Sequence, residues 1–257
     1  MDVANSVPEV GGPEEPEQTA VAVAPHIDRL RMAVARSMGA KAGELSERTG
    51  MPAASLPVLS MLRNTMPDRA VAIDDVLEVF LYTPPEVVRA SLEQLIDAGA
   101  IEPVASSRLR LGEAGRAVIT WMHGQIHDLL DGLWAGHDER VAGTLPLVEL
   151  AYEAAVSAGG PTLRVVSPVV DPVDASAAVR LAERLTPLRF HRFEAHASAW
   201  RSEGLTAEQA QELEPGPLRD RIEAETNRLA ALPYAALDPR QRAELCEGLA
   251  GLPADGV

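Results

Sequence analysis

Apolar residues recur at helical spacing along most of the chain, so the pattern predicts a mainly α-helical protein. The apolar positions of the first expected helix include Ile27, Leu30, Met32 and Val34. Further helices are expected at 42–52 (a short helix and turn), 56–66, 73–81, 84–98, from 113 onward, and at 139–158, 174–186, 187–203, 207–214, 217–231 and 239–249. Thr206 with Gln209, and Asp238 before Pro239, mark the starts of two of them.

The helix expected at 84–98 has the clearest start and stop signals in the sequence. Thr83-Pro84-Pro85-Glu86 fits a capping box, in which Thr83 and Glu86 each bond the other's backbone N–H and Pro84 takes the first helical position. Gly99 suits a left-handed cap at the other end. The apolar stripe between these signals consists of Val88, Leu92, Leu95 and Ile96.

Two short strands are expected after this helix, at Ile101–Val104 and Arg108–Leu111, on either side of a three-residue turn. Gly112 then begins the next helix. A later segment, 163–170 (LRVVSPVV), is rich in β-branched residues, but nearby prolines leave a strand and an extended loop equally open there.

The chain divides into three parts. Residues 1–24 combine Pro, Gly and Glu, which is typical of a disordered acidic tail. Residues 25–135 are expected to form the first folded domain, and 136–257 a helical C-terminal domain for dimerisation or ligand binding.

Composition narrows the classes of function. The net charge of −15 argues against a large nonspecific nucleic-acid surface, although it leaves room for a local basic patch. Cys246 is the only cysteine, so an intrachain disulfide and a cysteine-based zinc site are both excluded. Neither a membrane span nor a basic secretory signal is present, and we therefore expect a cytoplasmic protein. The absence of GxSxG, GxGxxG and Walker motifs predicts no enzyme activity and no cofactor.

Two motifs resemble the MarR-like regulators. Ala98-Gly99-Ala100-Ile101 is similar to the AGLI that closes their recognition helix, and 109–117 (LRLGEAGRA) resembles the segment where their wing turns into the dimerisation helix. The resemblance covers about 26–135. It implies a winged helix-turn-helix with a short β-hairpin wing, followed by the helical C-terminal domain.

The resemblance also implies a homodimeric transcriptional regulator that binds double-stranded DNA and responds to a small hydrophobic effector. Arg89 would enter the major groove, where a guanidinium can bond guanine, and Ser91 would also contact DNA. Arg108 and Arg110 would contact phosphates from the wing.

The sequence departs from this family in ways that leave an alternative open. The wing is short, lacks an Asp-Arg-Arg stretch, and ends at Gly112 in place of the usual Thr. The positions of helix 84–98 expected to face outward are Glu86, Arg89, Ala90, Glu93 and Asp97. The alternative hypothesis is a winged helix that has lost DNA binding and serves as a small-molecule or protein interaction module.

Two segments of the C-terminal part resemble a second group. Residues 188–196 (LRFHRFEAH) and 222–230 (IEAETNRLA) are similar to little-characterised actinobacterial helix-turn-helix-like proteins. This likeness implies lineage more than activity.

Histidines and tryptophans supply the remaining candidates. His123 and His127 are spaced to face one metal from a helix, and a composite metal site could add His191, Glu194 and His196. The alternative is that these are hydrogen-bonded or surface side chains. Trp121, Trp134 and Trp200 could line a pocket for a small hydrophobic effector, or could simply pack in the core.

Overall fold

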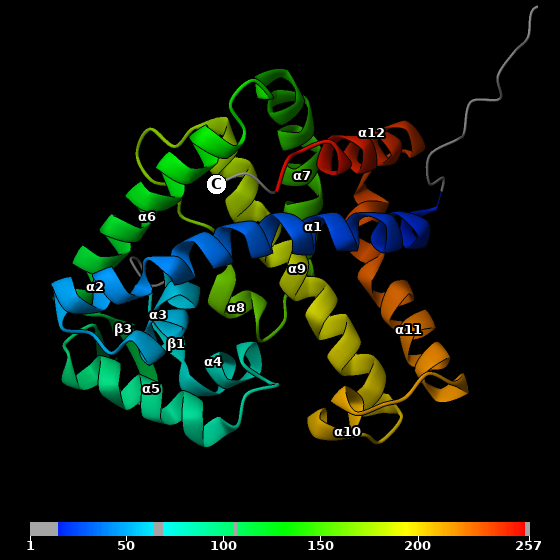
Figure 1. Ribbon diagram of the computed structural model, residues 1–257. Coiled ribbons are helices and arrows are strands. Elements are labelled where there is room, and N and C mark those ends of the chain that lie inside the picture. The colour runs from blue at the N-terminus through cyan, green and yellow to red at the C-terminus, as the bar shows by residue number, and fades with distance from the viewer. Residues whose placement is uncertain (1–14, 64–68, 105–106, 255–257) are drawn as a thin grey trace, which may run out of the picture.

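Four long helices form the frame of the protein in the computed structural model, which describes residues 15–63, 69–104 and 107–254 (Figure 1). They are α1 (Pro16–Ala40), α6 (Glu113–Leu133), α7 (Asp138–Ala158) and α9 (Ala177–Ser202). α9 contacts the other three and also α11 (Pro217–Ala230), so it is the central element. No helix within the described ranges is both long enough and apolar enough to cross a membrane.

A smaller helical unit surrounds the sheet. It consists of α2 (Ala42–Thr49), the 3-10 turn Ala53–Ser55, α3 (Leu56–Leu62), α4 (Ile73–Val79) and α5 (Pro85–Asp97). The sheet has the order β1-β3-β2, all antiparallel, with β1 at Val71–Ala72, β2 at Ile101–Val104 and β3 at Arg108–Leu111. The bounds predicted for β2 and β3 are confirmed. β1 was not expected, because two residues leave no alternating pattern in a sequence.

α5 confirms the predicted helix but not its predicted start. Val88, Leu92 and Leu95 are buried on one side, and Gly99 has φ of +67° beyond the last turn. The capping box is wrong, because Pro84 is the N-cap and no side chain caps the helix. The helix begins at Pro85, one residue later than expected, so Thr83 lies outside the capping position.

The other two helix starts are confirmed. Thr206 and Gln209 form a capping box before α10 (Ala207–Gln211), and Asp238 forms one with Gln241 before α12 (Pro239–Ala250). In both cases the capping residue directly precedes the first helical residue, which is the spacing that Thr83 lacks.

α1 begins earlier than the sequence suggested. Residues 1–14 lie outside the described residues, but Pro16–Ala24 are helical, so the expectation of a disordered tail through residue 24 is wrong for this part. Thr19, Ala20 and Val23 are buried there. They lie on a helix that contacts α11, α12 and the 3-10 turn Leu232–Ala236, and this packing gives the segment its order.

α9 replaces two expected helices with one. A break was predicted before Pro187, yet the helix continues through it. Leu185 and Leu188 are buried on either side, so tertiary packing outweighs the hydrogen bond that proline cannot donate. Of 163–170, where a strand and an extended loop were both open, the first four residues form the one-turn helix α8 (Leu163–Val166), and 167–170 are loop. The apolar residues of α8 are buried.

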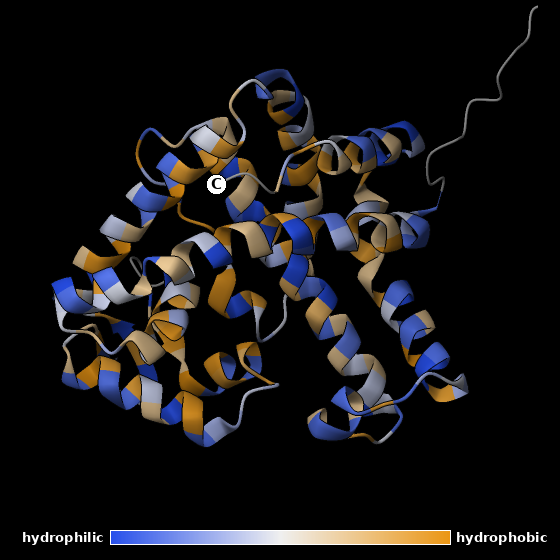
Figure 2. Cartoon of the chain, in the orientation of Figure 1, coloured by the Kyte–Doolittle hydropathy of each residue, from blue (hydrophilic) through white to orange (hydrophobic). Residues whose placement is uncertain are grey.

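Two main hydrophobic clusters stabilise the fold. The helical core lies among α1, the second half of α6, α7, α9 and α12, and the sheet core among α2–α5, the sheet, the first half of α6 and α8. Figure 2 shows the mainly hydrophobic α8 beside α3 and α4, within the sheet core. Residues from both sides of position 135 contribute to each cluster, and α6 and α9 extend through both.

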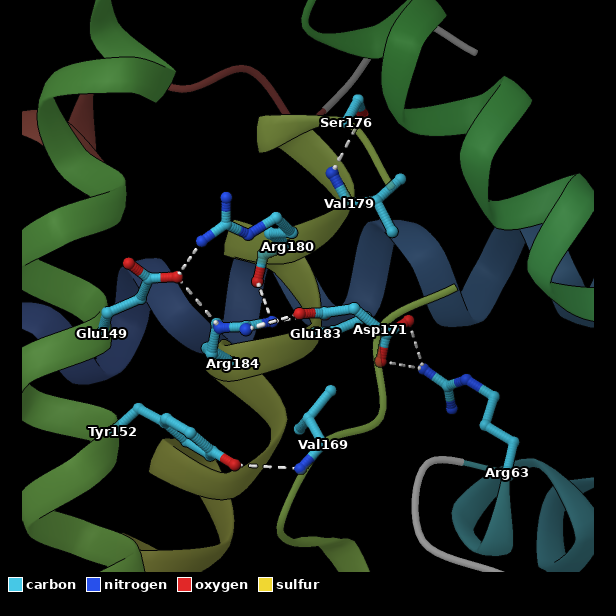
Figure 3. A network of polar contacts seen from close by, with 10 residues as sticks. All are labelled: Arg63, Glu149, Tyr152, Val169, Asp171, Ser176, Val179, Arg180, Glu183 and Arg184. Carbon is cyan, nitrogen blue, oxygen red and sulfur yellow. Dashed lines mark hydrogen bonds and ion pairs between the residues drawn. The ribbon is translucent and has the colours of Figure 1, made fainter. Parts of the chain in front are cut away.

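A buried ion pair joins α3 to α9. Arg63 and Glu183 have side chains only 2% exposed, and Arg63 Nη2 lies 2.8 Å from Glu183 Oε2 (Figure 3). Arg63 also donates from Nη1 to the carbonyl of Ser60 at 2.7 Å. Because charges in a core cost free energy unless they are paired, each partner depends on the other.

We expect Glu183→Gln to lower the free energy of unfolding by about 3–5 kcal/mol, because it leaves Arg63 buried without a counter-charge. The matched control is Glu102→Gln, which breaks the exposed pair with Arg110 and should cost about 0–1 kcal/mol. Urea unfolding measures both. Equal effects of the two substitutions would show that the buried pair has no special role.

Candidate functional site

The four residues predicted to contact DNA do not share one exposed basic surface. Arg89 is exposed on α5, as expected. Ser91 is only 8% exposed, so its predicted contact with DNA is wrong. It lies one turn from Val88 and Leu95 and therefore falls on the buried side of the helix.

Both arginines of β3 already have partners. Arg110 Nη2 donates to Glu102 Oε2 at 2.7 Å, and the two residues are directly opposite each other in the sheet. Arg108 donates to the carbonyl oxygen of Ala70. A phosphate would have to compete with both contacts.

The exposed face of α5 is acidic. The expected outward positions are confirmed, and they place Glu86, Glu93 and Asp97 around the single arginine, Arg89. Two arginines that lie against α4 are also neutralised by carboxylates of that helix. Arg164 of α8 pairs with Asp75 at 2.6 Å, and Arg201 of α9 pairs with Glu78 at 2.9 Å. A face of this sign repels the phosphate backbone.

The predicted metal site is not assembled. Across the described ranges, no group of three or more His, Cys, Asp or Glu side chains is placed to hold a metal ion. His127 faces Asp131 at 3.5 Å near the surface. His123 is half-buried, and its pKa is lowered by burial and by the charge of Arg63. His123 and His127 lie on one helix, α6, as predicted, but no side chain of α9 completes a metal site with them.

The three residues of α9 in the predicted metal site, His191, Glu194 and His196, are instead buried or hydrogen-bonded within the fold. Glu194 accepts a hydrogen bond from the Thr162 hydroxyl at 2.7 Å and another from the Thr162 backbone N–H, at the start of α8. Burial raises its pKa. His196 Nδ1 lies 3.2 Å from Thr226 Oγ1 of α11. His191 is buried, and burial lowers its pKa to about 4, which keeps it neutral.

The three tryptophans pack in three separate clusters and line no common pocket, so the predicted effector site among them is wrong. Trp134 lies in the helical core and donates from Nε1 to the Pro253 carbonyl at 3.0 Å. Trp121 packs on the sheet core. Trp200 lies in a small third cluster and donates to the Tyr82 hydroxyl at 3.1 Å.

A cavity of about 530 Å³ lies between α1–α4 and α9, with Met122 of α6 in its wall. The larger apolar side chains that line it are Met38, Leu56, Met61, Phe80, Phe190 and Phe193. Four of these, Met38, Met61, Phe80 and Phe193, are only half-buried. The walls thus leave apolar surface in contact with water, at a free-energy cost that a bound molecule would remove.

Few polar groups interrupt this lining. Tyr82 contributes its ring and a hydroxyl group whose pKa is raised by burial, so it keeps its proton. Arg189 stands at the edge, where its Nε lies 2.7 Å from Asp28 of α1. An apolar space with a few polar groups is the usual form of a small-molecule site.

Sequence reasoning expected an effector pocket between helices but did not find these residues. They come from α1–α4 and from α6 and α9, which follow much later in the chain, and the sequence marks each of them only as part of an apolar helix face. Comparisons with protein families, with curated proteins and with solved structures found no match to this chain.

We expect the free energy of unfolding to fall as the pH decreases from about 6.5 to about 4. His191 has a folded-state pKa below its ordinary value, so in this window the unfolded chain binds more protons. His191→Gln should reduce the loss by about 2–3 kcal/mol. The pKa values of His123 and His196 are lowered as well, so part of the pH dependence of stability should remain in this variant.

Chemical denaturation at several pH values measures this slope, with His127→Gln as the control that removes an exposed imidazole. A slope that is unchanged by His191→Gln would mean that His191 takes up its proton as readily in the folded protein as in the unfolded chain.

Proposed function

We propose that this protein binds a small, mainly apolar molecule in the cavity between α1–α4 and α9, on a scaffold related to the winged helix-turn-helix. The observation that carries the proposal is the cavity itself. Its volume of about 530 Å³ falls in the range of about 300–1,000 Å³ that is usual for such sites.

The lining supports an adaptable apolar site. Methionines in the wall, Met38, Met61 and Met122, have flexible side chains that fit ligands of irregular shape. Phe190 and Phe193 supply large apolar surfaces from the opposite helix, α9. A ligand that covers these side chains gains roughly 25 cal/mol per Å² of apolar surface removed from water.

The order of elements supports the winged-helix relationship. The chain runs α3, β1, α4, α5, β2, β3, and the strands lie in the order β1-β3-β2. The recognition helix of such a unit would be α5 and the wing would be the β2–β3 hairpin. With three carboxylates around Arg89 and with Arg110 neutralised, this unit favours the form that has lost DNA binding.

We expect Ala35→Trp to abolish ligand binding by filling the cavity. Ala35 lines it from an exposed position on α1, so the indole ring enters the space without displacing a core side chain. The probe is Nile red, an uncharged dye whose emission shifts to shorter wavelength in apolar sites. The control is Met32→Trp on the same helix, exposed and outside the cavity.

Wild type and Met32→Trp should bind Nile red with micromolar affinity, and Ala35→Trp at least about tenfold more weakly, which is a loss of about 1.4 kcal/mol. Wild-type protein that leaves the dye emission unshifted, or equal binding by all three proteins, would contradict the proposal.

A DNA-binding homodimer is the second candidate function. It is favoured by the same element order and by the exposed position of Arg89 on α5. Fluorescence anisotropy with DNA upstream of the protein's own coding sequence, at two salt concentrations, separates the candidates. Our proposal predicts no binding at micromolar protein in low salt. Salt-dependent binding that Arg89→Ala weakens by about 1–3 kcal/mol would establish the regulator instead.

A further inference from the structure

We infer that the ligand is an amphipathic anion, with an apolar body in the cavity and a carboxylate held by Arg189 and Arg192 of α9. This inference rests on the proposed function and specifies the chemical class of the ligand. It begins from the space that adjoins the cavity.

A second hollow of about 170 Å³ lies next to the cavity, between α1, α9 and the Leu232–Ala236 turn. The two spaces share Tyr82, Arg189 and Phe193, so they meet at these side chains. Arg192 and His196 extend the hollow along α9. The apolar cavity thus adjoins a smaller space in which Asp28, Arg189, Arg192 and His196 lie among apolar side chains.

The two arginines of the hollow have hydrogen-bond donors to spare. Arg189 uses only Nε, toward Asp28, and its two terminal nitrogens bond to nothing in the described parts of the chain. Because its side chain is 40% exposed and that of Asp28 is 58% exposed, their pairing is weak. Arg192 donates from Nη2 to Asn227 at 2.8 Å, whereas its Nη1 is buried without a partner.

A third guanidinium, which lines neither space, is close enough to Arg189 for their charges to interact. Arg31 of α1 is 9% exposed, and its Nη1 also lacks a partner within the described residues. Burial and the like charges of Arg63 and Arg189 lower its pKa to about 10. Glu183 opposes these charges, but it already pairs with Arg63. In a protein of net charge −15, this is an unusual local excess of cationic donors.

The available groups select an anion over a cation. Among the described residues, Asp28 is the only carboxylate that lines either space, and it already accepts from Arg189. Glu223 lies 3.8 Å from Arg192, and burial keeps His196 neutral at physiological pH. Free N–H donors of Arg189 and Arg192 match the two oxygens of a carboxylate. The Tyr82 hydroxyl accepts from Trp200, which leaves its own proton to donate.

The test is displacement of Nile red by decanoate and by decan-1-ol, which share a ten-carbon chain and differ in charge. Decanoate should displace the dye from wild-type protein at a concentration about 10- to 100-fold lower than decan-1-ol does, as charge-assisted hydrogen bonds imply. Arg189→Gln and Arg192→Gln should each remove most of this advantage while decan-1-ol still competes. The control is Arg201→Gln, a similarly exposed arginine of α9 outside both spaces.

The outcomes separate the inference from the proposed function. If the dye binds but acid and alcohol compete equally, the inference is wrong and the apolar site stands. A similar loss in Arg201→Gln would also overturn it, because a general charge effect would then explain the preference. If the dye does not bind at all, the proposed function fails and the inference fails with it. Retained binding of decan-1-ol by each variant shows that the fold is intact.

Discussion

Arg63 and Glu183 face each other where the sheet core meets the helical core, and their buried contact connects α3 with α9. Both helices also contribute residues to the wall of the cavity. On the same helix, Arg184 binds Asp171 at 2.6 Å and lies 3.5 Å from Glu149 of α7, which fixes α9 from its other side (Figure 3). A buried pair adds little net stability compared with apolar packing, but it penalises every arrangement in which one partner is unpaired.

The distribution of charge gives the molecule two different surfaces. Outside, α5 presents carboxylates around Arg89, and the arginines near the sheet are held by acidic side chains or by carbonyl groups. At the cavity and the adjoining hollow, Arg189 and Arg192 of α9 keep unused donors, and Arg31 of α1 is buried near Arg189 with one donor unpaired among the described residues. A protein with this arrangement is better suited to an amphipathic anion than to a phosphate backbone.

The parts of the fold that the sequence predicted well carry local signals. The apolar stripe of α5 and the glycine at position 99 lie within a few residues of each other, and the alternation in 108–111 is set by the pleat of one strand. The capping boxes at Thr206 and Asp238 depend only on residues three positions apart. Such signals depend little on tertiary context, although Thr83 and Glu86 have the same spacing and form no capping box.

The remaining features depend on contacts between distant segments. Pro187 predicts a helix break, but α9 is packed on several sides and continues through this residue. Ser91 is a polar residue and was expected at the surface, but it lies on the side of α5 that faces the core. The site is the extreme case, since Met38, Phe80 and Phe193 meet only after α1, α4 and α9 have assembled. Periodicity identifies each as apolar, and only the fold brings them together.

Methionine methyl groups offer the most direct test of the site's location. Met38, Met61 and Met122 line the cavity, whereas Met32 is exposed on α1 and Met51 is buried outside the cavity. In a spectrum of ¹³C-methyl-methionine protein titrated with decanoate, our account predicts shifts at the first three methyl groups and none at Met32. Shifts at Met32, with the three cavity methyl groups unmoved, would place the binding site elsewhere and contradict the account.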